Sequence, residues 1–267
     1  MLRARSGLWS AVSTRSSSTA ARWHGLGVPL DPVDEVGALA WIEAALTSGS
    51  GGWIATPNPE IAVAAWRTPA LAEALDAASL VVADGVGVLW ASRILGGPLH
   101  DRVPGIELLD RILALCAARD WPVYFLGARP GVAAAAATQA QTRWPGLRVV
   151  GTWHGYFTAS QGSDVLAGIA AAGPRFVAVG MGHPRQELWL AANMASLPGA
   201  LGMACGGSLD VLAGQVGRAP LWVRRANLEW LYRIVTAPRE RLARSGTLLV
   251  FAARVATVKL GLAPRLG

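Results

Sequence analysis

The chain has 267 residues, of which 52% are hydrophobic, and its formal net charge is +7 at pH 7. This length suits one large α/β domain, or one domain with a terminal extension, and the hydrophobic content is ample for a sizeable core. No apolar run reaches about 18 uninterrupted residues, which argues against a membrane-spanning helix. The two cysteines, Cys116 and Cys205, are too few and too far apart for a disulfide framework or a zinc site. We expect both to be buried thiols of a reduced, cytoplasmic protein.

The positive charge is concentrated at the C-terminal end. Residues 214–267 contain ten Arg or Lys and two Glu, a net charge of +8, whereas residues 1–213 carry a net charge of −1. A basic segment of this kind suits phosphate, an acidic membrane surface or nucleic acid. No nucleic-acid recognition motif accompanies it, so we do not expect nucleic acid as a partner.

In chain order, residues 1–22 are rich in Ser, Arg and Ala without an acidic residue, which predicts a disordered leader. Residues 23–213 then alternate between strand and helix patterns and form the predicted catalytic core. Strands are predicted over residues 23–30, 53–56, from 80, 122–127, 147–150, 175–180 and 200–204. Helices are predicted over residues 31–46 (with Asp31 as the N-cap), 59–66, 86–95, 104–118, 130–143, 161–172 and 184–195. This alternation predicts an α/β fold with a mainly parallel sheet flanked by helices.

Residues 214–267 form a predicted helical appendage, with helical patterns over residues 227–235, 238–244 and 247–262 and no intervening strand. In the last helix an apolar stripe contains Leu248, Phe251, Ala252, Val255 and Leu262, while Arg254 and Lys259 lie off it. This pattern predicts a basic amphipathic appendage that lies on an anionic membrane surface. A helix packed on the body, with its arginines in solvent, fits the composition equally well.

The predicted strand ends carry residues suited to chemistry, and open α/β sheets bind ligands at that edge. Thr56 and Asn58 lie in a loop held by two prolines, which presents a hydroxyl and an amide beside a helix start, although Asn58 also suits a simple N-cap. Asp84 follows an apolar strand and precedes Gly85 and Gly87. A carboxylate there is poorly placed for packing and well placed for proton abstraction, although a helix cap is the alternative.

Two further strand ends are rich in glycine. Residues 127–131 form a turn that can present N–H groups to phosphate, but they match neither the P-loop nor the dinucleotide-binding pattern. Residues 180–187 contain Gly180 and Gly182, which allow a ligand to approach the backbone, followed by Gln186 and Glu187 in the first turn of a helix. A nucleotide-dependent oxidoreductase is therefore disfavoured. Because no His, Cys and carboxylate cluster or D-x-D pair occurs, no metal and no cofactor are expected.

Seven short motifs occur together along the chain. They are Thr56-Pro-Asn58, Ala83-Asp84-Gly85-x-Gly87, Arg102-x-Pro-Gly105, Phe125-Leu126-Gly127, Gly151-x-x-x-Gly155-Tyr156-Phe157, Gly180-x-Gly182-x-Pro184-x-Gln186-Glu187 and Leu228-Glu229-Trp230-Leu231-x-Arg233. Over roughly Gly25 to Arg244 the chain closely resembles the WecG/TagA/CpsF family of bacterial glycosyltransferases (family 26).

The resemblance implies an inverting, metal-independent transferase with a compact, Rossmann-like α/β fold. Such enzymes move a sugar, typically of the N-acetylmannosamine type, from a UDP-sugar donor to a polyprenyl-diphosphate-linked acceptor, as peripheral proteins at the inner face of the plasma membrane. By its place in the motifs, Asp84 resembles the general base of the family, and Thr56 resembles a residue next to that base which orients the substrate. The residues implied for substrate binding are Asn58, Arg102, Gly127, Gly180, Gly182, Gln186 and Glu187. Those implied for the lipid diphosphate and the membrane are Arg218, Arg224, Arg225, Arg233 and Arg239.

The main alternative is a non-catalytic nucleotide- or membrane-binding module on the same fold, which would bind without turnover. The joint presence of Thr56, Asp84 and Gln186 argues against this alternative. The identity of the transferred sugar and the formation of a homo-oligomer are left open by the sequence.

Overall fold

The computed structural model of the protein describes residues 21–220, 222–223, 232 and 238–264. Within this part of the chain six strands form one sheet, in the order β2-β1-β6-β5-β3-β4, and every pair of neighbours is parallel. The strands are β1 (Gly52–Ala55), β2 (Leu80–Val81), β3 (Val123–Gly127), β4 (Val149–Trp153), β5 (Phe176–Gly180) and β6 (Leu201–Ala204). The predicted Rossmann-like α/β fold is confirmed.

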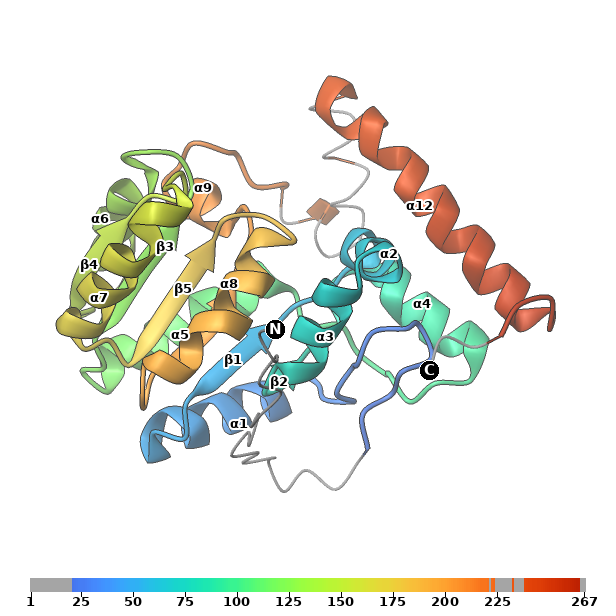
Figure 1. Ribbon diagram of the computed structural model, residues 1–267, viewed down its shortest axis with the longest axis horizontal. Helices are drawn as coiled ribbons and strands as arrows, with labels where there is room; N and C mark the ends of the chain where they lie inside the picture. Colours follow the sequence, from blue (N-terminus) through green and yellow to red (C-terminus); the bar gives the residue numbers. More distant parts are fainter. Residues whose placement is uncertain (1–20, 221, 224–231, 233–237, 265–267) are drawn as a thin grey trace, which may run out of the picture.

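Helices cover both faces of the sheet (Figure 1). They are α1 (Glu35–Ser48), α2 (Pro59–Arg67), α3 (Pro69–Ala77), α4 (Val86–Leu95), α5 (Gly105–Ala118), α6 (Val132–Arg143), α7 (Gly162–Ala172), α8 (Arg185–Asn193), α9 (Ser208–Leu212) and α12 (Pro238–Lys259), with 3₁₀ turns η1 (Ala159–Gln161) and η2 (Met194–Ser196). Helices α3 and α9 are absent from the sequence prediction. A single residue, Thr68, separates α3 from α2, and α9 has only five residues, so neither gives a long periodic pattern.

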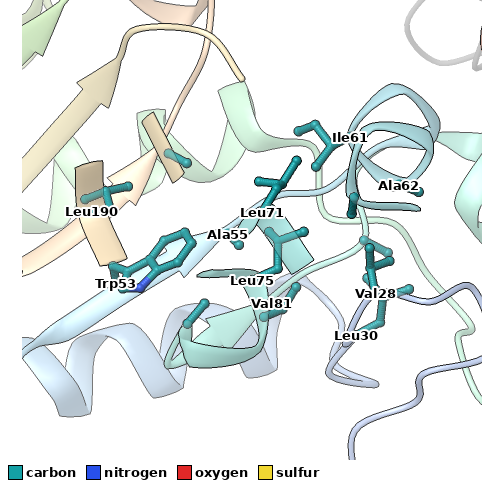
Figure 2. Packing of buried hydrophobic residues seen from close by; sticks show 14 of the residues in the cluster. Val28, Leu30, Trp53, Ala55, Ile61, Ala62, Leu71, Leu75, Val81 and Leu190 are labelled. Carbon is teal, nitrogen blue, oxygen red and sulfur yellow. The ribbon is translucent and has the colours of Figure 1, made fainter. Parts of the chain in front are cut away.

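The core lies on both faces of the sheet because successive strand residues point to opposite sides. On one face, strand residues such as Trp53 and Val177 pack with α2, α3, α7 and α8, and Figure 2 shows Trp53 near Leu190 and Val81 near Leu75. On the other face, residues such as Phe125 pack with α1, α5, α6 and α9. A sheet buried on both faces requires nearly continuous apolar strands, which explains the apolar runs in the sequence.

The start of the first helix differs from the prediction. Helix α1 begins at Glu35, and the N-cap is Asp34, whose carboxylate accepts the N–H of Gly37 at 2.7 Å. Asp31, the predicted cap, instead accepts the N–H of Val81 at 2.7 Å and so fixes strand β2. The predicted strand over residues 23–30 is an isolated antiparallel bridge between its two end residues.

Arg22, assigned to the predicted leader, is bonded to the body. Its Nε lies 3.0 Å from a carboxylate oxygen of Asp31, and its Nη2 donates to the carbonyl of Ala78 at 2.6 Å. Residues 1–20 of the predicted leader lie outside the described residues.

Helix α12 is a single helix where two were predicted, and it crosses α2 and α4 (Figure 1). Phe251 stacks on Trp66, with ring centroids 5.8 Å apart and planes at 3°, and Phe251 and Val255 are buried. This helix therefore packs on the body, and it also leaves Leu249 exposed. The helix predicted over residues 227–235 falls outside the described residues, apart from residue 232. Among the described helices, none combines the length and the apolar character needed to cross a membrane.

Candidate functional site

A pocket of about 970 Å³ opens at the carboxyl-terminal edge of the sheet. Its lining comes from the segments that follow β1, β2, β5 and β6 and from the first turns of α2, α4 and α5. Helix α12 supplies the opposite wall. The pocket thus lies where open parallel sheets place their ligands, as the sequence predicted for the strand ends.

Thr56 and Asp84 enter this pocket from the adjacent strands β1 and β2. The loops that carry them are joined by a hydrogen bond of 3.1 Å from the N–H of Asp84 to the carbonyl of Pro57, and Thr56 Oγ1 donates to the carbonyl of Ala204 at 3.3 Å. Both side chains lie against Gly105, the first residue of α5. A Cβ atom at Gly105 would lie 3.1 Å from Thr56 Oγ1 and 3.4 Å from Asp84 Oδ2. Glycine therefore lets a hydroxyl and a carboxylate approach the same helix end.

Several features favour an anion in this pocket. Helices α4 and α5 both begin at the lining, and neither has a side-chain cap on its first turn. The N–H groups and dipole of an uncapped helix N-terminus attract negative charge. Arg102 also lines the pocket, and in the described part of the chain no ion pair or hydrogen bond engages its guanidinium. Two helix ends and one arginine thus lie on the same lining as the carboxylate of Asp84.

Asn58 lines the pocket and also caps a helix. Its side-chain oxygen accepts the N–H of Ile61 at 3.0 Å, at the start of α2. The capping function foreseen for Asn58 as an alternative is therefore present, while its position on the lining still allows contact with a ligand.

Gln186 connects α8 to the turn that follows β6. Its Oε1 accepts the N–H of Gly206 at 3.0 Å, and its Nε2 donates to Glu187 Oε1 at 2.8 Å. Gly206 has a φ of +51° and lines the pocket beside Gln186. Gln186 thus fixes part of the lining through bonds at both ends of its amide.

Glu187 does not line the pocket, although the resemblance groups it with substrate-binding residues. Its side chain is buried, and burial raises the pKa of its carboxyl, an effect reduced by the bond from Gln186 and by the nearby His183. Its second oxygen, Oε2, is buried without a hydrogen-bond partner among the described residues. The structure therefore places Glu187 behind Gln186, away from the pocket.

The three glycines of the predicted site differ in position. Gly127 and Gly180 lie outside the pocket lining, where β3 and β5 meet, and a Cβ atom at Gly127 would lie 2.3 Å from the carbonyl oxygen of Gly180. A Cβ atom at Gly180 would lie 2.7 Å from the carbonyl oxygen of Gly206 and 2.9 Å from Leu209 Cδ1, so close packing accounts for both glycines. Gly182 does line the pocket, with a φ of +74° and no atom within 4 Å of an added Cβ.

The arginines expected at a lipid diphosphate are only partly described. Arg218 pairs with Glu107 at 2.7 Å and lies outside the pocket lining. Its Nε is buried and has no partner in the described part of the chain. Arg224, Arg225 and Arg233 lie outside the described residues, and for Arg239 the structure describes the backbone, in the first turn of α12, and not the side chain.

Other lining residues were not expected from the sequence. Gly105 belongs to a motif for which no function is predicted, and His183 lines the pocket as well. The α4 residues Trp90 and Ile94 also line the pocket; no sequence signal placed them there, because an amphipathic pattern does not say which partner covers it. Cys205 lines the pocket too, but burial raises its pKa to about 12, so its thiol is protonated at neutral pH and is a poor nucleophile. Among the residues described, no three His, Cys, Asp or Glu side chains form a group that could hold a metal ion.

Fold and pocket together define an α/β protein whose pocket, at the carboxyl-terminal edge of the sheet, is lined by two uncapped helix N-termini, by Arg102 and by the carboxylate of Asp84. The model of the glycosyl transferase WecG/TagA/CpsF family matches residues 23–264. A relative from Staphylococcus aureus (strain NCTC 8325), named as an N-acetylglucosaminyldiphosphoundecaprenol N-acetyl-β-D-mannosaminyltransferase, is 34% identical over 250 residues, which cover 93% of this chain and 97% of the relative. A relative of the same name from Bacillus spizizenii (strain W23) is 34% identical over 193 residues, 72% of this chain and 74% of the relative. The chain belongs to the WecG/TagA/CpsF glycosyl transferase family, as its ordered motifs predicted.

Proposed function

We propose that the protein is an inverting glycosyltransferase that moves an N-acetylmannosamine-type sugar, or a related hexose, from a UDP-sugar to a polyprenyl-diphosphate-linked sugar. The observation that carries the proposal is the convergence of Asp84 and Thr56 beside two uncapped helix N-termini in one pocket. The relatives support the choice of acceptor, because their name specifies an N-acetylglucosaminyl-diphosphoundecaprenol substrate.

Asp84 is the proposed general base. In an inverting displacement the acceptor hydroxyl attacks the anomeric carbon from the face opposite the leaving group, and one carboxylate suffices to take the hydroxyl proton. The new bond joins the acceptor oxygen to the anomeric carbon, while the bond from that carbon to the β-phosphate oxygen of UDP breaks. Thr56 lies against the same helix end, and we assign to it the orientation of the substrate beside the carboxylate.

The leaving UDP gains negative charge, which must be stabilised in the transition state. The uncapped N-termini of α4 and α5 and the guanidinium of Arg102 are the groups we assign to this task. Fixed dipoles and arginine stabilise such charge strongly in a partly enclosed site. We therefore propose that transfer needs no metal ion.

We also propose that the protein acts as a peripheral protein on the inner face of the plasma membrane. Helix α12 and the residues that follow it expose the apolar side chains of Leu249, Leu260 and Leu262, and the helix carries the basic residues Arg254 and Lys259. Apolar and basic side chains on one exposed segment favour binding to an anionic lipid surface. The lipid nature of the proposed acceptor requires such contact.

The substitution Asp84→Asn tests this function. With UDP-N-acetylmannosamine and an N-acetylglucosaminyl-diphosphate lipid, we expect kcat/KM to fall by about 10²- to 10⁴-fold, the usual contribution of a general base. UDP affinity and melting temperature should stay close to those of the wild type. Asp101→Asn is the matched control, because Asp101 is exposed and lies outside the pocket lining. Full transfer by the Asp84→Asn variant would overturn the assignment of the base.

A further inference from the structure

The pocket continues from its polar end into an apolar groove between α4 and α12. The groove is lined by Trp90 and Ile94 of α4 and by Phe251, Ala252, Val255 and Ala256 of α12. Trp90 is 59% exposed and Ile94 is 46% exposed, so neither is part of the core. Large apolar side chains left open beside a polar pocket mark a surface that another apolar group covers.

Helix α12 holds this groove open. Phe251 and Val255 fix the helix to the body, since both are buried and Phe251 stacks on Trp66. Ala252 and Ala256, one helical turn apart, are exposed and line the groove, so the space opposite α4 is bounded by small side chains. The groove is therefore bounded on one side by α12, which is fixed to the body, and on the other side by the large, exposed apolar residues of α4.

Charge is distributed unequally along the pocket. Outside α4 and α12 the lining carries Glu60, Asp84, Arg102 and His183, whereas Lys259 is the one charged residue that the described parts of α4 and α12 contribute to it. A nucleotide or sugar in the apolar half would find few hydrogen-bond partners, whereas an alkyl chain needs none. The occupant of the groove is therefore expected to be an uncharged hydrocarbon that is joined to an anionic group.

We propose that the groove between α4 and α12 binds the first prenyl units of the lipid acceptor, and that the diphosphate of the acceptor lies toward the polar end of the pocket. This inference rests on the proposed function, and the undecaprenol portion of the acceptor in the relatives' name matches the chemistry of the groove. Burial of apolar surface is favourable in proportion to the area removed from water, so even one or two prenyl units add substantially to acceptor affinity.

A substitution that fills the groove provides the test. Ala252→Trp places a large side chain in the open space without removing a buried residue, and Ala253→Trp is the matched control, because Ala253 is exposed on the same helix and lies outside the lining. Binding is measured by titration calorimetry in solution without vesicles, with farnesyl diphosphate and inorganic diphosphate as probes. This readout does not depend on turnover.

We expect farnesyl diphosphate to bind the wild type and the Ala253→Trp variant at least about tenfold more tightly than inorganic diphosphate does, a difference of about 1.4 kcal/mol. In the Ala252→Trp variant this preference should disappear, while the weaker affinity for inorganic diphosphate is retained. If both variants prefer farnesyl diphosphate over inorganic diphosphate equally, or if the wild type shows no such preference, the groove does not bind the prenyl chain. If Ala252→Trp instead converts a dimer into a monomer in sedimentation experiments, the groove is a contact between two copies and the proposal is wrong.

Transfer assays separate this inference from the proposed function. A wild type that binds farnesyl diphosphate in the groove but transfers no sugar would contradict the proposed function and leave the groove assignment intact. If transfer occurs, the acceptor KM should fall with prenyl chain length in the wild type and not in the Ala252→Trp variant, while the KM of the UDP-sugar donor is the same in both. Transfer with an acceptor KM that is independent of chain length in the wild type would contradict the groove and not the reaction.

Discussion

The contact between Phe251 and Trp66 should determine whether α12 stays on the body. Phe251 is 5% exposed, and its ring lies parallel to that of Trp66 at 5.8 Å. The substitution Phe251→Ala removes both the burial of the side chain and the stacking. Because α12 packs on α2 and α4 at the edge of the molecule, we expect local release of the helix and not unfolding of the core.

The size of the effect follows from two contributions. Burial of a Phe side chain contributes about 1.5–3 kcal/mol, and an aromatic pair adds about 0.5–1.5 kcal/mol. A loss of about 2–4 kcal/mol raises the population of the detached helix by about 30- to 1000-fold. Amide hydrogens of α12 should therefore exchange much faster, with little change in the exchange of the sheet.

Hydrogen exchange followed by mass spectrometry, on peptides that cover residues 246–259, measures this release. Leu249→Ala is the control, because Leu249 is on the same helix and is 73% exposed. If Phe251→Ala and Leu249→Ala leave α12 equally protected, the stacking does not fix the helix, and the groove wall would need another explanation.

Two further predictions concern groups outside the pocket lining. Burial raises the pKa of the Glu187 carboxyl, so the unfolded chain loses this proton at a lower pH than the folded protein does. The free energy of unfolding should therefore fall as pH rises from the pKa of the unfolded state to that of the folded state. Glu187→Gln should remove this part of the pH dependence, measured by urea unfolding at several pH values. An unchanged pH dependence would contradict a raised pKa. At Gly127 the φ is +137°, and an added Cβ would lie 2.3 Å from the Gly180 carbonyl oxygen. Gly127→Ala should therefore lower the free energy of unfolding by about 2–6 kcal/mol. Gly182→Ala, where an added Cβ meets no atom within 4 Å, should lower it by about 1–2 kcal/mol. Similar losses in the two variants would show that backbone contact is not the reason for Gly127.

The fold could be predicted because its signals are local. Each strand of the sheet is an apolar run bounded by turn residues, and a parallel sheet buried on both faces requires such runs. The start of α1 was missed because Asp31 and Asp34 both suit a helix cap, and only tertiary structure shows that Asp31 bonds to Val81. Helix α3 was missed because one residue separates it from α2.

The site could be predicted only in part. Thr56 and Asp84 follow strands that are adjacent in the sheet, so strand-end reasoning brought them together. The same reasoning could not separate Gly127, which allows close packing of two backbones, from Gly182, which lines the pocket. Contacts made across long sequence distances, such as the wall that α12 forms opposite Trp90, leave no periodic signal that identifies the partner.

The proposed inverting transfer is tested most directly by the stereochemistry of the product. The wild-type protein is supplied with α-linked UDP-N-acetylmannosamine and an N-acetylglucosaminyl-diphosphate lipid in the presence of EDTA, and the anomeric configuration of the product is read by NMR. Our account predicts a β-linked disaccharide, formed at an undiminished rate without a divalent ion. An α-linked product, or transfer that occurs only after a divalent ion is restored, would contradict it.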